Sequence, residues 1–332
     1  MPLPTPADVH VNTPLTNISI AYMQSAADFI ADRVFPAVPV LKQSDRYYTY
    51  DRGYWNRDDM QERAPASESA GTGYTVDNSP NYFCIEKGLH QDVPWQVRGN
   101  ADPVVNPDRD ATMLVTQKAL IHREVKWVAG FFAGGLWTGD DDGVAASVGT
   151  NEFLQWNDAA STPIEDIRAA GTSVQQLTGF RPNKLTVGRE VYDKLVDHPD
   201  IVDRIKYTSG NNNPAVVNKE ALAALFELDE VLVAGAIQNT ANENATNVHA
   251  FIGGKKALLT YSPPNPSLMT PSAGYTFNWT GLSGVPSLAQ RGARVSVIPM
   301  PLKKADRVEI EDAFDQKLIS ADLGYFFDTA VA

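Results

Sequence analysis

Residues 106–133 read NPDRDATMLVTQKALIHREVKWVAGFFA, and this segment constrains the architecture more than any other. Asparagine is a favourable N-cap, proline suits the first helical position, and aspartates suit the first turn. Apolar residues then recur at helical spacing, which predicts one apolar face made of Leu114, Ile121, Val125, Val128 and Phe132. We therefore predict a single helix over residues 107–133, about 40 Å long at 1.5 Å per residue. A helix of this length acts as a strut between other elements.

Strand-forming segments at the end of the chain need a helix to cover them. Residues of high β-propensity, separated by turn residues, predict strands at 294–298, 307–311, 317–320 and 325–327. Because a sheet must bury one face, the helix at 107–133 is the element available to cover it. We therefore assign residues 96–162 and 289–332 to one domain, although they are far apart in the sequence.

The region between these segments, residues 163–288, alternates helical and strand patterns. Helices are predicted at 164–177, 189–196 and 219–226, and strands at 184–187, 230–233, 248–252 and 257–261. This alternation predicts an α/β sandwich inserted into the first domain. Several glycines precede it and end the long helix, and the acidic run at 140–142 is interpreted as a solvated turn.

Two segments precede the long helix. Residues 1–40 are rich in Pro, Asn and Thr and cannot form a core alone, so we predict an arm that lies on another surface. Residues 41–95 hold two β-prone runs on either side of a long tip rich in Gly, Ser and Pro, which predicts an extended hairpin. Arginines, acids and aromatic residues alternate along it. The hairpin residues that we expect to contact partners are Arg46, Tyr48, Tyr50, Asp51, Arg52, Trp55, Arg57, Asp58, Asp59 and Arg63.

The composition excludes several classes of protein. The 332 residues include 28 Lys and Arg against 40 Asp and Glu, a formal net charge of −12, and the densest basic clusters are the pairs at 255–256 and 303–304. Because nucleic-acid-binding proteins neutralise phosphates with clustered cations, tight general DNA or RNA binding is not expected. The single cysteine, Cys84, excludes a disulfide within the chain and indicates a reducing compartment. We expect no secretory signal and no membrane span.

No local motif for catalysis, cofactor binding or metal binding stands out. The Gly-Lys pair at 254–255 lacks the first glycine of a phosphate loop, and no two histidines lie within five residues of each other. His122 is interpreted as a packing or surface residue, and His198 as part of a turn between helices. Cys84 lies in an aromatic β-run and is interpreted as a buried small apolar residue. We therefore predict no catalytic residue, no cofactor and no metal.

Two pairs of stretches have a characteristic sequence. They are RPNKLTVGREVYDKL at 181–195 with HPDIVDRIK at 198–206, and RVEIEDAFDQKLI at 307–319 with GYFF at 324–327. Together with the order of the parts, they resemble the major capsid proteins of tailed bacteriophages, which have the Hong Kong 97 type fold. The resemblance implies an α+β fold whose parts are an N-arm at 1–40, an E-loop hairpin at 41–95, a P-domain with the spine helix at 96–162 and 289–332, and an inserted A-domain at 163–288.

The resemblance also implies a function. Copies of such a protein self-assemble through hexamers and pentamers into an icosahedral phage head, in the host cytoplasm, and enclose double-stranded DNA without sequence-specific contact. Separate scaffolding, decoration and portal proteins are the expected partners. Some family members join subunits covalently through a lysine of the hairpin, so the lack of lysine between Lys42 and Lys87 predicts a shell without such links. Two alternatives remain open: an encapsulin-like bacterial compartment shell, which shares the fold, and an unrelated soluble α/β enzyme.

Overall fold

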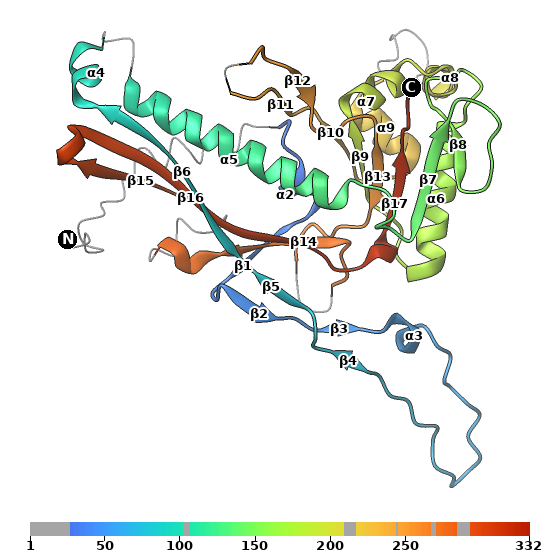
Figure 1. Cartoon of the computed structure of the whole chain (residues 1–332). Coiled ribbons are helices and arrows are strands. Elements are labelled where there is room, and N and C mark those ends of the chain that lie inside the picture. Colours follow the sequence, from blue (N-terminus) through green and yellow to red (C-terminus); the bar gives the residue numbers. More distant parts are fainter. Residues whose placement is uncertain (1–26, 102–105, 209–216, 244, 267–269, 284–292) are drawn as a thin grey trace.

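The computed structural model describes residues 27–101, 106–208, 217–243, 245–266, 270–283 and 293–332. One lobe holds a sheet crossed by a long helix, a second lobe holds a sheet flanked by shorter helices, and a hairpin projects away from both (Figure 1). This mixture of helices and separate sheets confirms the predicted α+β class.

The long helix is α5, Pro107–Phe131. Its N-cap is Asn106, whose side-chain oxygen accepts the backbone N–H of Arg109 at 3.1 Å, so the predicted start is confirmed. The predicted apolar face is right at its end, where Phe132 is buried and Val128 packs against a core cluster, and wrong at Leu114, which is 43% exposed. The buried residues of the helix are Ala111, Thr112, Val115, Thr116, Leu120, Arg123, Glu124 and Trp127. The face differs because it buries an ion-paired arginine and a carboxylate, which a count of apolar residues does not register.

The helix lies on a five-stranded sheet in the described part of the chain. Its order is β1 (Ala37–Val40), β14 (Gly274–Trp279), β16 (Ala305–Leu318) and β15 (Ala293–Met300), with β6 (Ile85–Pro94) also paired to β16. Strand β16 is continuous where two strands were predicted, because its middle residues stay paired with β6 and then with β14. Strand β6 belongs to this sheet, so the predicted hairpin ended about ten residues too late.

The second sheet has six strands in the described part of the chain. Their order is β10 (Glu230–Ala234), β9 (Lys184–Gly188), β13 (Ala257–Thr260), β17 (Gly324–Asp328), β7 (Gly139–Val144) and β8 (Glu152–Leu154). The flanking helices are α6 (Pro163–Thr178), α7 (Arg189–Val196), α8 (Pro199–Thr208) and α9 (Lys219–Phe226). Helices α6, α7 and α9 and strands β9, β10 and β13 lie where the sequence predicted them.

The two sheets do not follow the predicted domain boundaries. Strands β7, β8 and β17 come from segments assigned to the first domain, whereas β14 comes from the segment assigned to the insertion. The acidic run at 140–142 lies in β7 and not in a turn, because β7 pairs in parallel with β17. The hydroxyl of Tyr325 on β17 also donates to Asp141 at 2.7 Å. Pairing between distant segments decided these assignments, and the pattern within one segment does not reveal it.

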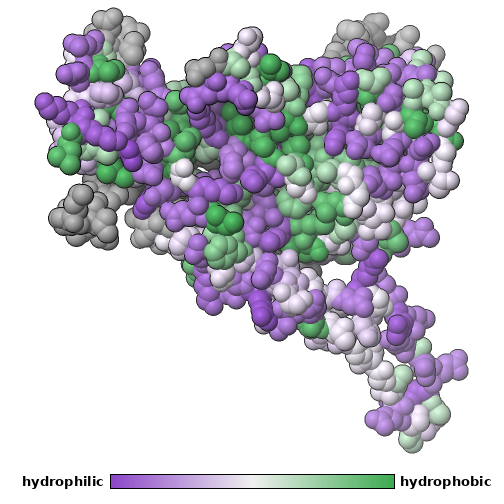
Figure 2. Space-filling model, in the orientation of Figure 1, coloured by the Kyte–Doolittle hydropathy of each residue, from purple (hydrophilic) through white to green (hydrophobic). Residues whose placement is uncertain are grey.

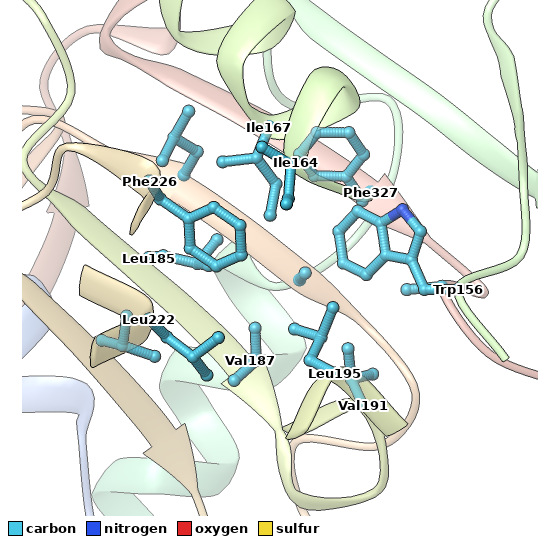
Figure 3. Packing of buried hydrophobic residues seen from close by; sticks show 14 of the residues in the cluster. Trp156, Ile164, Ile167, Leu185, Val187, Val191, Leu195, Leu222, Phe226 and Phe327 are labelled. Atoms are coloured by element: carbon cyan, nitrogen blue, oxygen red, sulfur yellow. The ribbon is translucent and has the colours of Figure 1, made fainter. Parts of the chain in front are cut away.

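The core of the second lobe lies between its sheet and its helices (Figure 3). Trp156 and Phe327 meet with ring centroids 5.2 Å apart, and the indole N–H of Trp156 donates to Asp166 on α6 at 3.0 Å. Leu185 of β9 and Ile164 of α6 are almost completely buried. Burial of each such side chain stabilises the fold by about 1.5–3 kcal/mol, so the core contributes strongly to the stability of this lobe.

The described end of the N-terminal arm lies against the chain's own long helix; the rest of that prediction, for residues 1–26, lies outside the described residues. Helix α2 is Ala31–Val34. The side chain of Phe35 is fully buried and meets Trp127 edge-on with centroids 5.8 Å apart. Glu124 accepts the backbone N–H groups of Ile30 and Ala31, both at 3.0 Å. This part of the arm therefore belongs to the core of its own chain.

Short elements complete the described fold. They are α4 (Trp95–Asn100), the hairpin of β11 (Ile237–Asn239) and β12 (His249–Phe251), and 3-10 turns at Thr280–Ser283, Pro301–Lys303 and Ala321–Leu323.

Candidate protein–protein interface

The projecting hairpin is held together by two short antiparallel ladders. Strand β2 (Ser44–Arg46) pairs with β5 (Asn81–Phe83), and β3 (Thr49–Tyr50) pairs with β4 (Val76–Asp77). The tip beyond them, residues 51–75, contains the short helix α3 (Arg52–Trp55) and otherwise no regular element. It extends away from both sheets (Figure 1). A projection this thin has no core of its own, so it needs support from elsewhere.

Stacked aromatic rings fix the base of the hairpin to the first sheet. Tyr82 stacks on Phe277 of β14 with ring centroids 4.6 Å apart, and Tyr47 lies 5.6 Å from the same ring. Cys84 is fully buried beside them, and its backbone N–H donates to the carbonyl of Gln43 at 2.8 Å. The base of the hairpin is therefore packed firmly against the first sheet, although its ladder is a separate two-stranded sheet.

One ion pair joins the tip to the body. Nη1 of Arg52 lies 2.5 Å from Oδ2 of Asp322, and the two side chains are 44% and 29% exposed. Asp322 lies in the turn before β17 and also accepts the hydroxyl of Thr138 at 2.7 Å. Arg52 was predicted to contact another subunit, but here it pairs within its own chain.

The other predicted contact residues lie on the surface of the hairpin. Asp51 accepts the N–H of Gly53 at 2.9 Å and Asp58 accepts that of Met60 at 3.3 Å, so both acids shape local turns. Asp59 is partly buried. The exposed remainder consists of Arg46, Tyr48, Tyr50, Trp55, Arg57 and Arg63.

Three exposed aromatic side chains form a cluster at the start of the tip. The ring centroids of Tyr50, Trp55 and Tyr74 lie 5.8 to 6.2 Å apart. Their exposed fractions are 39%, 55% and 62%. The projecting hairpin is otherwise mostly hydrophilic on the face that Figure 2 shows. Tyr74 was missed by the sequence analysis because it comes from the returning side of the tip.

Two apolar residues outside the predicted set are even more exposed. Leu302 is 100% exposed in the turn Pro301–Lys303, and Met60 is 92% exposed at the hairpin tip. Both lie beside charged residues in segments without strand or helix periodicity. Single exposed apolar residues of this kind are common on protein surfaces, so they do not mark a contact by themselves.

His198 lies 3.1 Å from Ser161, Nε2 to Oγ, a contact that resembles a nucleophile with its base. The N–H of Asp200 donates to Nδ1 of His198 at 3.3 Å, so Nδ1 is the acceptor and the ring proton is on Nε2. A protonated Nε2 cannot accept the serine proton. The hydroxyl of Ser161 instead donates to the carbonyl of Asp158 at 2.7 Å. The pair is a buried structural clamp ahead of α8.

Cys84 and His122 show no activated chemistry. Burial, followed by the charge of Asp315, raises the pKa of the Cys84 thiol to about 11, the opposite of an activated thiolate. Burial and the nearby charge of Lys87 lower the pKa of His122. Among the described residues, no three His, Cys, Asp or Glu side chains are grouped so that they could hold a metal ion. No helix in the described ranges is long and apolar enough to span a bilayer.

The chain is similar to known proteins over nearly its whole length. Residues 150–269 match the family model described as phage major capsid protein E. The major capsid protein of Pseudomonas phage JBD67 is 30% identical over 330 residues, which are 97% of each chain. A phage-related protein from Bordetella bronchiseptica has a similar crystal structure, with a TM-score of 0.69 at 21% identity over 97% of this chain and 98% of that one. The mature capsid of bacteriophage PhiM1 gives a TM-score of 0.52 at 11% identity, over 88% and 84% of the two chains.

Proposed function

This chain belongs to the phage major capsid protein family, and from that premise we propose that its copies form hexamers and pentamers that close into an icosahedral head around double-stranded DNA. The role of the chain is structural and not enzymatic, as a component of the shell of a phage virion. We place its assembly in the host cytoplasm.

The hairpin is the observation that supports assembly most strongly. Its base is fixed by Tyr82 stacked on Phe277, while Tyr50, Trp55 and Tyr74 remain exposed on a projection without a core. A rigid base with an exposed aromatic tip is suited to reach a neighbouring subunit, because exposed apolar clusters mark protein contacts. The exposed hairpin residues of the predicted set are therefore proposed contacts, and Arg52 is proposed to position them.

The charge of the chain fits a container for DNA. The net charge of −12 repels phosphates, so packaged DNA is held by enclosure and not by tight, sequence-specific contact. Scaffolding, decoration and portal functions are proposed to come from separate proteins.

Sedimentation velocity of the purified chain tests this function. We expect particles far larger than the 36.2 kDa chain, and nucleic acid protected from nuclease inside particles made during infection. A species that stays at the mass of one chain at all salt concentrations would exclude a shell. Particles that hold a protein cargo and no DNA would favour the encapsulin-like alternative.

A further inference from the structure

Residues 28–35, which we call the strap, lie between the two lobes and contact both (Figure 1). Helix α2 forms the middle of the strap. Its buried side chains are Ile30, Ala31, Val34 and Phe35. The cluster that contains them also includes residues of the long helix and of the second sheet, namely Trp127, Phe132, Leu232, Ala234, Leu258 and Phe326. The two lobes therefore share a core that the strap completes.

The strap is bound to the long helix by buried polar contacts. The carboxylate of Glu124 accepts the N–H groups of Ile30 and Ala31, both at 3.0 Å. Nη1 of Arg123 donates to the carboxylate of Asp32 at 3.0 Å. The side chains of Glu124 and Arg123 are 1% and 2% exposed, so water does not compete for these bonds. This attachment to the first lobe is the stronger one.

The polar contacts of the strap with the second lobe are more open to water. The guanidinium of Arg33 pairs with Glu230 of β10, and the two side chains are 45% and 35% exposed. The ammonium of Lys184, on the neighbouring strand β9, donates to the carbonyl of Arg33 at 2.5 Å. Exposed ion pairs contribute little to stability and are screened by salt. Changes on this side therefore release the strap from the second lobe and leave it bound to the long helix.

Gly235, which follows β10 directly, allows the strap to approach the second lobe closely. A Cβ at this position would lie 2.7 Å from Oδ1 of Asp28 and 3.4 Å from its Cβ. The first separation is too short for a carbon and an oxygen that are not bonded, so a larger side chain at 235 would displace the strap. Asp28 itself is exposed, so this contact can be reached from solvent.

The strap adds a second point of attachment between the lobes. Near the end of the long helix, the rings of Phe132 and Phe326 already meet edge-on with centroids 5.6 Å apart. Phe326 lies on β17, three strands away from Glu230 on β10, which is about 14 Å at about 4.8 Å per strand. One contact acts as a pivot, whereas two contacts at this separation prevent rotation about it.

Rotation between the lobes matters for a closed assembly. A shell closes at one size only if the rotation from each copy to the next is the same at equivalent contacts. A chain whose two lobes turned freely would vary this rotation, and its particles would vary in size.

We propose that the strap stays closed in the assembled shell and fixes the angle between the two lobes, so that the particles have one size. This inference rests on the proposed shell function and assigns the control of particle size to residues 28–35.

An engineered disulfide tests whether the strap stays closed. Asp28→Cys with Gly235→Cys places two Cβ atoms at the 3.4 Å noted above, close to the mean of about 3.8 Å in disulfides. Diamide takes up the two hydrogens as the bond forms, and the natural Cys84 is fully buried and does not compete. We expect the oxidised variant to assemble with the yield and particle size of the wild type. The two single variants are the controls.

Two results of this experiment would overturn the proposal. Loss of assembly that is reversed by dithiothreitol would show that the strap has to open. Failure of the two thiols to join, followed by alkylation and mass spectrometry, would show that the strap does not lie against the second lobe.

Release of the strap tests the control of size. Gly235→Val with Arg33→Glu removes the space for Asp28 and places two acids together at Glu230. We expect the fraction of particles in the main size class, counted by negative-stain electron microscopy, to fall at least twofold. The matched control is Arg181→Glu, which reverses one charge of an exposed pair with Glu227 inside the second lobe and should leave the size unchanged. Circular dichroism checks that each variant is folded, and the cross-linked variant gives an independent test.

Failure of the strap and failure of the shell are distinguishable. A wild-type chain that never assembles would contradict the proposed function. Wild-type assembly together with particles of a single, normal size from the released variant would overturn the role of the strap alone.

Discussion

The guanidinium of Arg123 donates from Nε and Nη2 to the two carboxylate oxygens of Asp312, each at 2.8 Å, and both side chains are buried. Nη1 of the same arginine reaches both oxygens of Asp32 in the arm at 3.0 Å, and Nη2 also donates to Asn278 of β14 at 3.1 Å. One side chain of the long helix thus holds the arm and two strands of the sheet. We call Arg123 and its three partners the hub. It holds together the lobe from which the hairpin projects.

Removal of the arginine should destabilise the chain strongly. Arg123→Ala leaves the carboxylate of Asp312 buried without its counter-charge, and loss of one partner of a buried ion pair costs about 3–5 kcal/mol. The free energy of unfolding in urea measures the effect. The control is Arg109→Ala, because Arg109 forms only an exposed contact with Asp110 and its loss is expected to cost less than about 1 kcal/mol. Equal stability of the two variants would contradict the role of the hub.

Glu124 should make the stability depend on pH. Burial raises the pKa of this carboxyl from 4.5 to about 7. Because the folded chain then binds the proton more tightly than the unfolded chain, the stabilising contribution is complete below pH 4.5 and is lost as pH rises towards 7. The loss amounts to about 3 kcal/mol. Glu124→Gln removes the titration, so the difference in unfolding free energy between variant and wild type should grow over this interval. Parallel pH profiles would contradict the prediction.

The arginines of the hairpin should matter for assembly and not for folding. Arg46→Glu, Arg52→Glu and Arg57→Glu together should leave the circular dichroism spectrum unchanged, because none of the three belongs to a core cluster. Reversing the three charges should prevent the hairpin from pairing with charges of the neighbouring subunit, and at Arg52 it also breaks the ion pair with Asp322. Assembled particles should therefore be absent in sedimentation velocity. The same three positions changed to Lys are the control. Normal particles from the Glu variant would show that these arginines face solvent and are not needed for assembly.

The shell should contain no lysine-linked hairpins. No lysine lies between Lys42 and Lys87, so the hairpin tip offers no amine for an isopeptide bond. Particles heated in detergent are expected to give a single band at the mass of one chain on a denaturing gel. A ladder of multimers would require a different covalent link.

Local sequence patterns predicted most helices and strands. They did not predict which strands pair with each other or which face of a helix is buried, because contacts between distant segments decide both. The start of α5 was readable because Asn106 and the residues after it are cap and first-turn residues. The buried face of α5 could not be predicted in full, because Arg123 and Glu124 are stabilised there by partners from distant segments. For the same reason β17 was predicted as a strand but assigned to the wrong sheet.

The features of the candidate interface were likewise predictable only in part. Exposed aromatic residues such as Trp55 were recognisable from their setting in a polar tip. The pairing of Arg52 with Asp322 joins residues 270 positions apart, so it leaves no local pattern in the sequence.

Electron cryo-microscopy of assembled particles tests the central claim most directly. We predict a closed icosahedral shell in which density for the hairpin of each copy lies on the neighbouring copy. A closed shell with each hairpin folded onto its own subunit would contradict the proposed contact, and a preparation that contains only single chains would contradict the shell itself.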